Sequence, residues 1–160
     1  MTDLAKAIQL REAGHLEEAR SVLLKLITLE PINPLVWFQC AWVHDALGSE
    51  SEAVPYYTKA LELGLLGEER QGAYLGLGST YRALGLYDES KLLFEQAIQE
   101  YPDQREFRIF YAMVLYNLKD YSKAMEIVLQ QLLETSNDTG IQSYSRAISF
   151  YSDKLDQTWK

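Results

Sequence analysis

The chain has 160 residues, of which 48% are hydrophobic and 24% charged, a composition typical of a globular domain rather than of a disordered segment. A chain of this length buries roughly two-thirds of its unfolded surface, so it does not need disulfides or a metal ion to fold. Its four prolines and nine glycines are too few for the many turns of an all-β fold. The formal net charge of −8 argues against nucleic acid or an anionic membrane as a partner.

Cysteine content and hydropathy indicate the compartment. The single cysteine, Cys40, excludes an intramolecular disulfide and fits a reducing environment, so we expect a cytoplasmic protein. The segment Met1–Leu10 lacks the long apolar core of a secretory signal. No apolar run reaches the length of about 18 residues that a membrane-spanning helix needs.

The chain repeats itself with spacings of 34, 37 and 34 residues between Gly14, Gly48, Gly85 and Lys119. Five residues after each of these positions stands a small residue: Ala19, Ala53, Ser90 and Ala124. The three glycines fall where one predicted helix ends and the next begins, the usual place for a left-handed residue. In the fourth unit Lys119 stands where glycine is expected.

The detailed pattern resembles the tetratricopeptide repeat, a helix–turn–helix unit of 34 residues. The third unit carries the fullest match: Tyr74, Leu77, Gly78, Tyr81, Leu84, Gly85, Tyr87, Phe94, Ala97 and Pro102. The resemblance covers about residues 2–137. It implies an all-α, right-handed superhelix (an α-solenoid) in a single domain 1–160, with repeats at about 1–33, 34–70, 71–104 and 105–138.

Beyond residue 138 the pattern changes to a single apolar stripe at helical spacing: Ile141, Tyr144, Ile148, Tyr151 and Leu155. The opposite face is polar and nearly uncharged: Gln142, Ser143, Ser145, Ser149 and Ser152. A solenoid needs a terminal unit with a polar outer face. We therefore predict one capping helix over about 139–158, with its serine face outward.

Two constellations could indicate chemistry. Cys40 and His44 share a helix face, as in a nucleophile pair or half of a metal site. Both fall on interior positions, and a zinc site would need two more ligands, so we expect core residues, no enzyme, no metal and no cofactor. The order of Gly72, Gly76 and Gly78 does not match a phosphate-binding loop.

The resemblance implies that the first helices of the repeats line a concave groove that binds another protein or a peptide. The groove positions carried over from the family are Ile8, Arg11, Phe38, Gln39, Trp42, Leu75, Ser79, Arg82, Ile109, Phe110, Met113, Tyr116 and Asn117. Some members hold a C-terminal carboxylate with lysine, asparagine and arginine at these positions, but the corresponding places here are mostly apolar, so such a carboxylate clamp is not expected. We expect Gly72 and Gly76 to leave space in this wall, and Arg11 and Arg82 to orient an acidic group.

The predicted function is therefore a non-catalytic adaptor or co-chaperone-like module that binds an apolar or amphipathic peptide or helix. Exposed apolar surface and aromatic side chains are typical of such interfaces. The alternative is a homodimeric structural or chaperone protein, whose groove is filled by its own C-terminal helix or by a second copy. Neither nucleic acid nor a membrane is expected as a partner.

Overall fold

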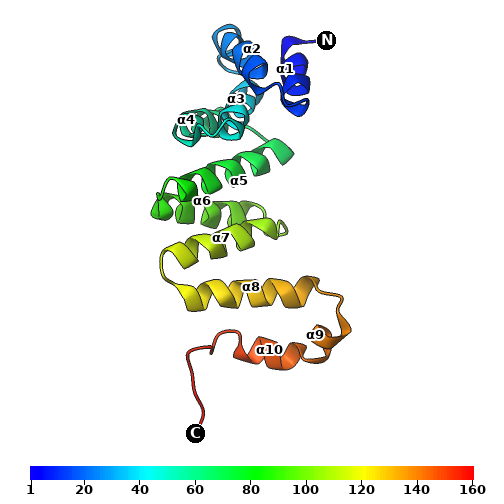
Figure 1. The fold of residues 1–160 in the computed structure, drawn as a ribbon, viewed down its shortest axis with the longest axis vertical. Coiled ribbons are helices and arrows are strands. Elements are labelled where there is room, and N and C mark those ends of the chain that lie inside the picture. The colour runs from blue at the N-terminus through cyan, green and yellow to red at the C-terminus, as the bar shows by residue number, and fades with distance from the viewer. The chain divides into compact units, whose positions relative to one another are not determined.

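The computed structural model describes residues 1–160, and the chain is helical throughout, with no strands (Figure 1). The ten helices are α1 (Asp3–Glu12), α2 (Leu16–Leu29), α3 (Pro34–Ala46), α4 (Glu50–Glu62), α5 (Gly67–Ala83), α6 (Tyr87–Glu100), α7 (Glu106–Asn117), α8 (Tyr121–Thr135), α9 (Thr139–Ser143) and α10 (Ser145–Tyr151). They form two compact units, 1–86 and 87–160. The division falls between α5 and α6, within the predicted third repeat, and the single domain 1–160 stays a prediction.

In the first unit, α1 packs on α2 and α3 on α4, and the first helices α1, α3 and α5 contact one another in that order. The apolar core is formed by Ala7, Ala19, Leu23, Leu26, Val36, Cys40 and Val43. Ala7 and Ala41 are fully buried, and such small side chains let neighbouring helices approach closely. The helical periodicity read from the sequence therefore matches the buried faces.

The turns between paired helices share one backbone motif. Gly14, Gly48 and Gly85 have φ angles of 83°, 75° and 77°, which confirms the predicted left-handed conformation. At each turn this residue donates to the carbonyl three residues back, and the next residue donates to the carbonyl five before it, as in a Schellman motif. Lys119 forms the same two bonds with φ 67°, and it is the one non-glycine residue with positive φ.

In the second unit, an aromatic cluster joins α6 to α7. The fully buried Phe94 lies 6.0 Å from Phe110 and 6.5 Å from Phe107 between ring centroids. A smaller cluster of Ala112, Leu115 and Ala124 joins α7 to α8. The two clusters hold α7 between its neighbours and leave one of its faces open.

The C-terminal region differs from the expected continuous helix. It breaks at Tyr144 into α9 and α10, and the helix ends at Tyr151 rather than near residue 158. Serine and threonine are weak helix formers because their hydroxyls compete for backbone hydrogen bonds. Glycine is a weak helix former because its backbone loses more conformational entropy in a helix. Here the Ser143 hydroxyl donates to the carbonyl of Thr139, and Gln142 donates to the carbonyls of Leu133 and Ser136 at the end of α8.

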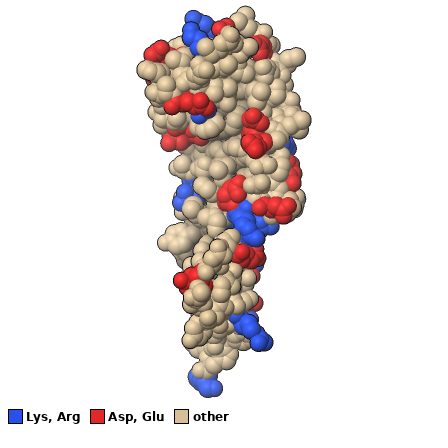
Figure 2. Space-filling view, turned by 90° about the vertical axis from the view of Figure 1, so that its right-hand side faces the viewer, with Lys and Arg blue, Asp and Glu red and all other residues tan.

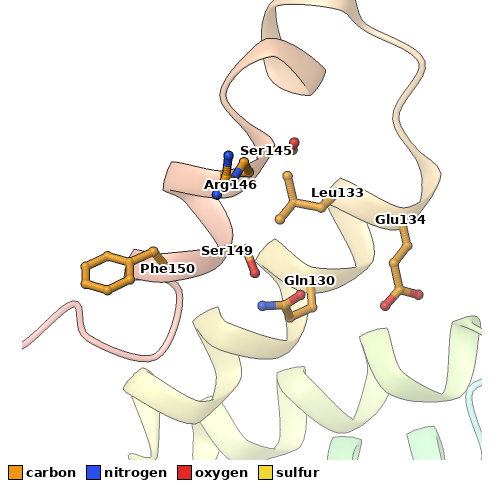
Figure 3. Close-up of a pocket in the computed structure, with 7 residues that line it drawn as sticks. All are labelled: Gln130, Leu133, Glu134, Ser145, Arg146, Ser149 and Phe150. Carbon is orange, nitrogen blue, oxygen red and sulfur yellow. The ribbon is translucent and has the colours of Figure 1, made fainter.

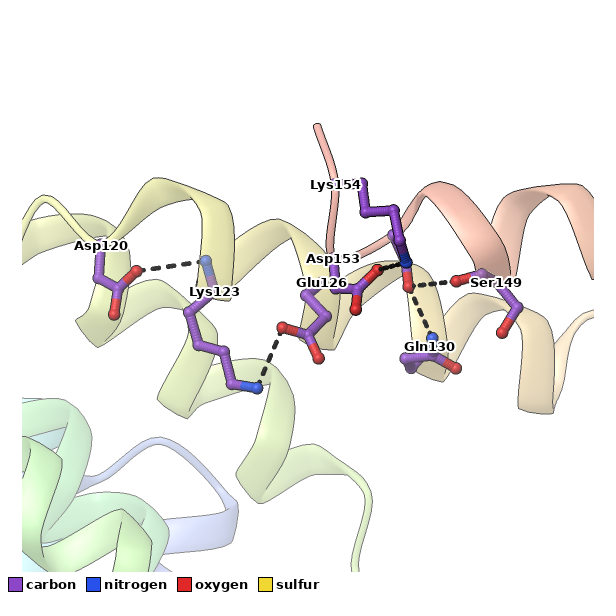
Figure 4. A network of polar contacts seen from close by, with 8 residues as sticks. Asp120, Lys123, Glu126, Gln130, Ser149, Asp153 and Lys154 are labelled. Carbon is purple, nitrogen blue, oxygen red and sulfur yellow. Dashed lines mark hydrogen bonds and ion pairs between the residues drawn. The ribbon is translucent and has the colours of Figure 1, made fainter. Parts of the chain in front are cut away.

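One serine after α10 is buried, but α10 does not turn a continuous serine face inward: Ser149 is exposed, and Ser145 and Ile148 are partly buried. The orientation predicted for the cap stays a prediction. Ser152, just after α10, is buried, and it accepts a hydrogen bond of 2.8 Å from Gln130 of α8, which is labelled in Figure 4. The Ser152 hydroxyl in turn donates to the carbonyl of Ser149. Tyr144 and Tyr151, from the expected apolar stripe, are exposed. The small Ser152 side chain can lie close to α8 because Gln130 satisfies its hydroxyl.

Candidate binding surfaces

The most organised part of the predicted groove lies in the first unit, where α1 meets α3. The Arg11 guanidinium stacks on the Trp42 ring, 3.7 Å from its centroid. Its Nε donates a hydrogen bond of 3.1 Å to Oε1 of Gln39, whose residue is only 6% exposed. Trp42 itself is 42% exposed. Three predicted site residues are therefore brought together, with the indole available to a partner.

Phe38 does not line an open groove. It is 4% exposed, and its ring lies against α5, where a Cβ at Gly72 would come within 3.1 Å of the ring. Likewise, a Cβ at Gly76 would lie 2.4 Å from the hydroxyl of Tyr57. The expectation that the two glycines leave space in the wall is wrong, because Phe38 and Tyr57 occupy that space.

The remaining first-unit positions flank Trp42 on the neighbouring helices. Ile8 precedes Arg11 by three residues and so lies on the same side of α1. Leu75 and Ser79, four residues apart on α5, are partly buried, and the Ser79 hydroxyl donates to the carbonyl of Leu75. We call Ile8, Arg11, Trp42, Leu75 and Ser79 the α1–α3–α5 face. Arg82 is partly buried in the last turn of α5, where a cation is favourable to the helix dipole.

Asp45, one turn beyond Trp42, connects three helices through hydrogen bonds within the protein. Its carboxylate accepts a hydrogen bond of 2.8 Å from the Tyr57 hydroxyl of α4 and another of 2.9 Å from the Thr80 hydroxyl of α5. Burial raises the pKa of this carboxyl above its usual value, although both hydroxyl donors act in the opposite direction. The carboxylate therefore fixes α3 against α4 and α5 beneath the face.

In the second unit, α7 carries the predicted positions Ile109, Phe110, Met113, Tyr116 and Asn117. Phe110 is partly buried against Phe94, and Ile109 and Asn117 are also partly buried. Met113 is 40% exposed and Tyr116 62% exposed. We call Ile109, Met113 and Tyr116 the α7 face.

Sequence reasoning missed an exposed apolar stripe on α8. It consists of Tyr121, Met125, Val128 and Leu132, all exposed, at intervals of three and four residues. Tyr121 meets Tyr116 edge-on with ring centroids 5.0 Å apart, so the stripe adjoins the α7 face. The spacing was visible in the sequence, but the same period also describes a buried helix face.

A shallow depression of about 550 Å³ lies between α8 and α10 (Figure 3). It is lined by Gln130, Leu133, Glu134, Ser145, Arg146, Ser149 and Phe150. Figure 3 shows Phe150 at one end and Glu134 at the other. The mixed and widely open lining lacks the convergent polar groups of a small-molecule site.

Cys40 and His44 are both buried, as expected for core residues. The His44 Nδ1 lies 2.7 Å from the backbone carbonyl oxygen of Cys40, and the imidazole stacks on Tyr56 with centroids 4.7 Å apart. Burial raises the pKa of the Cys40 thiol to about 12, whereas a nucleophilic cysteine needs a lowered pKa. No group of three His, Cys, Asp or Glu side chains is arranged to hold a metal ion.

Figure 2 shows acidic and basic side chains interspersed among uncharged ones on the face in view. None of the helices combines the length and hydrophobicity required to cross a bilayer.

Comparison with known proteins identifies the family. A family model described as tetratrico peptide repeat matches residues 34–155, most of the chain. The chain belongs to the tetratricopeptide repeat family. The first predicted repeat of this tetratricopeptide repeat protein, at 1–33, precedes the matched range. A search of curated proteins gives no match.

Solved structures share this tetratricopeptide repeat fold. YrrB, described as a TPR protein with an unusual peptide-binding site, superposes with a TM-score of 0.74 at 16% identity, over 96% of this chain and 80% of its own. A MamA fragment from Desulfovibrio magneticus RS-1 has a TM-score of 0.73 at 19% identity, over 98% and 88%. The Cut9–Hcn1 hetero-tetramer of APC/C gives 0.72 at 18% identity, over 94% of this chain and only 29% of that chain. At these identities the likeness shows the fold alone.

Proposed function

We propose that the chain is a non-catalytic interaction module that binds an apolar or amphipathic segment of another protein. The observation that carries this proposal is Trp42, an indole left 42% exposed at the centre of the α1–α3–α5 face. A large aromatic side chain in such a position is typical of binding hot spots. The tetratricopeptide repeat fold is an interaction scaffold, and YrrB, with the same fold, has a peptide-binding site by its description.

Two further features support an apolar ligand. Ile8 and Leu75 stand on the helices that flank Trp42, and neither carries charge. In the second unit, Met113 and Tyr116 of the α7 face are exposed, and methionine and tyrosine are enriched in interface cores. An amphipathic helix or an extended apolar segment suits either face.

Within this proposal the module acts as an adaptor or co-chaperone-like protein in the cytoplasm. The reducing compartment is favoured by a single unpaired cysteine. The raised pKa of Cys40 disfavours the cysteine nucleophile that the sequence suggested, which supports a non-catalytic role. The alternative of a groove filled by the C-terminal helix is less favoured, because α10 packs on α8, the second helix of its pair.

The test is affinity capture with the immobilised chain and with single variants, followed by mass spectrometry of what is retained. Trp42→Ala and Met113→Ala each reduce capture of a specific partner by about tenfold or more if they are interface anchors. Trp159→Ala is the matched control, because Trp159 is also an exposed tryptophan but lies beyond α10. Equal capture by wild type and Trp42→Ala contradicts the proposal.

Sedimentation of the purified chain examines the second-copy alternative. A monomer that exposes Trp42 to iodide or acrylamide quenching agrees with an open face. A stable dimer in which Trp42 is protected from the quencher favours the homodimer instead. Circular dichroism of each variant checks that helicity is retained.

A further inference from the structure

Arg11 is held more rigidly than a surface arginine. One face of its guanidinium is stacked on Trp42 at 3.7 Å, and its Nε–H is bonded to the nearly buried Gln39 at 3.1 Å. The side chain is only 12% exposed. The stacking leaves the plane of the guanidinium free, and the Nε–H bond leaves its Nη1 and Nη2 end, where a carboxylate can approach in that plane.

The end of the fork remains available. A guanidinium has five N–H donors. Those of Arg11 that are engaged are Nε–H, on Gln39, and one Nη2–H, on Glu12 at 3.4 Å. The Glu12 carboxylate is 63% exposed, so this long, single contact with a neighbouring residue is weak. Both Nη1 hydrogens and the second Nη2 hydrogen have no acceptor within the chain.

The surroundings favour an anion at this end. Arg11 has lost most of its water to Trp42 and Gln39, and a charge that is partly dehydrated gains from a charge-assisted hydrogen bond. Asp45, the nearest carboxylate along α3 from Trp42, is bonded to Tyr57 and Thr80 instead. The positive charge is therefore not neutralised from within the face.

We propose that Arg11 recognises an acidic side chain, Asp or Glu, in the bound segment, next to an apolar residue that contacts Trp42. This inference rests on the proposed function and specifies its ligand: an acidic, amphipathic peptide. Gln39 and Trp42 are positioning residues for the guanidinium, and the Nη1 and Nη2 groups make the contact. A phosphate is a poorer fit, because phosphate recognition uses clusters of arginines and Arg11 has Glu12 beside it.

The experiment selects ligands from a random 12-residue peptide display library on the wild-type chain and on variants. On wild type, we expect enriched peptides to combine an aromatic or Leu with a nearby Asp or Glu. Replacing that acid by Gln or Asn in a synthetic peptide weakens binding about tenfold, as measured by fluorescence anisotropy. With Arg11→Gln, the two peptides bind equally well.

A charge-matched control is available on the same helix. Lys6→Gln also removes one positive charge from α1, but Lys6 is exposed and lies five residues, or about 140°, from Arg11 around the helix. It keeps the preference for the acidic peptide. Arg11→Lys keeps the charge without the planar fork and retains only part of the preference.

Two outcomes overturn the inference, and they differ. If apolar peptides are enriched without an acid, or if the acid preference survives in Arg11→Gln, acidic recognition by Arg11 is wrong and the proposed function stands. If no peptide is enriched on wild type over Trp42→Ala, the proposed function itself fails, and this inference fails with it.

Discussion

Replacing Lys119 by glycine is expected to stabilise the protein. Lys119 has a φ of 67° and closes the turn between α7 and α8 with the same two backbone hydrogen bonds that glycine makes at four other turns. In this region the Cβ of an L-residue crowds the following carbonyl oxygen. No hydrogen bond or ion pair of its exposed side chain offsets that strain.

The size of the gain follows from two opposing effects. The left-handed conformation costs a non-glycine residue about 1–2 kcal/mol. Glycine opposes this gain, because it loses more backbone entropy on folding, at a cost of about 0.5–1 kcal/mol in the free energy of unfolding. The net gain for Lys119→Gly is therefore about 0.5–1 kcal/mol, which raises the melting temperature of a chain of this size by about 1–4 °C.

Urea unfolding followed by circular dichroism measures the effect. The control Lys119→Ala removes the same charge and side chain but keeps the strained Cβ, so it gives no comparable gain. The mirror substitution Gly85→Lys introduces the strain at φ 77°, where a Cβ meets nothing within 4 Å, and lowers stability by a similar amount. An equal gain from glycine and alanine at position 119 refutes the reasoning.

Three other predictions concern buried or partly buried groups of the first unit. The Cys40 thiol, with its pKa raised to about 12, reacts slowly with iodoacetamide at pH 8 in the native state and rapidly in urea; fast native labelling contradicts this. Gly76→Ala lowers the free energy of unfolding by about 1–2 kcal/mol, because its Cβ would lie 2.4 Å from the Tyr57 hydroxyl, and an unchanged urea midpoint rejects that account. Burial raises the pKa of the Asp45 carboxyl above 3.8 in the folded protein, so the folded state binds a proton at Asp45 more tightly than the unfolded chain does. The free energy of unfolding therefore falls as the pH rises above about 4. Asp45→Asn removes this decline, which parallel urea titrations from pH 4 to 6 detect as a difference in slope.

The repeat positions were predictable because local rules govern them. Helices commonly end in a residue with left-handed backbone conformation, and glycine adopts this conformation most easily. Gly14, Gly48 and Gly85 supply it at the turns between paired helices. The burial of Cys40 and His44 followed from their place on the apolar face of a predicted helix. These features depend on residues within one or two turns of the chain.

The candidate site was only partly predictable. The alignment with the tetratricopeptide repeat pattern assigned both Phe38 and Trp42 to the groove. In the structure Phe38 is buried in the core and Trp42 is exposed. The difference depends on Gly72, more than thirty residues away, whose missing side chain admits the phenyl ring. No spacing within α3 carries that information.

The amino-acid sequence alone therefore determined the all-α repeat architecture, the turn positions and the family, since each arises from short-range periodicity and backbone preference. Which side chains of the predicted groove meet solvent was decided only in the tertiary structure. The stacking of Arg11 on Trp42 and the burial of Ser152 beside Gln130 arise from contacts between helices. Such contacts depend on shape and hydrogen-bond partners far along the chain, and a residue pattern within one helix does not specify them.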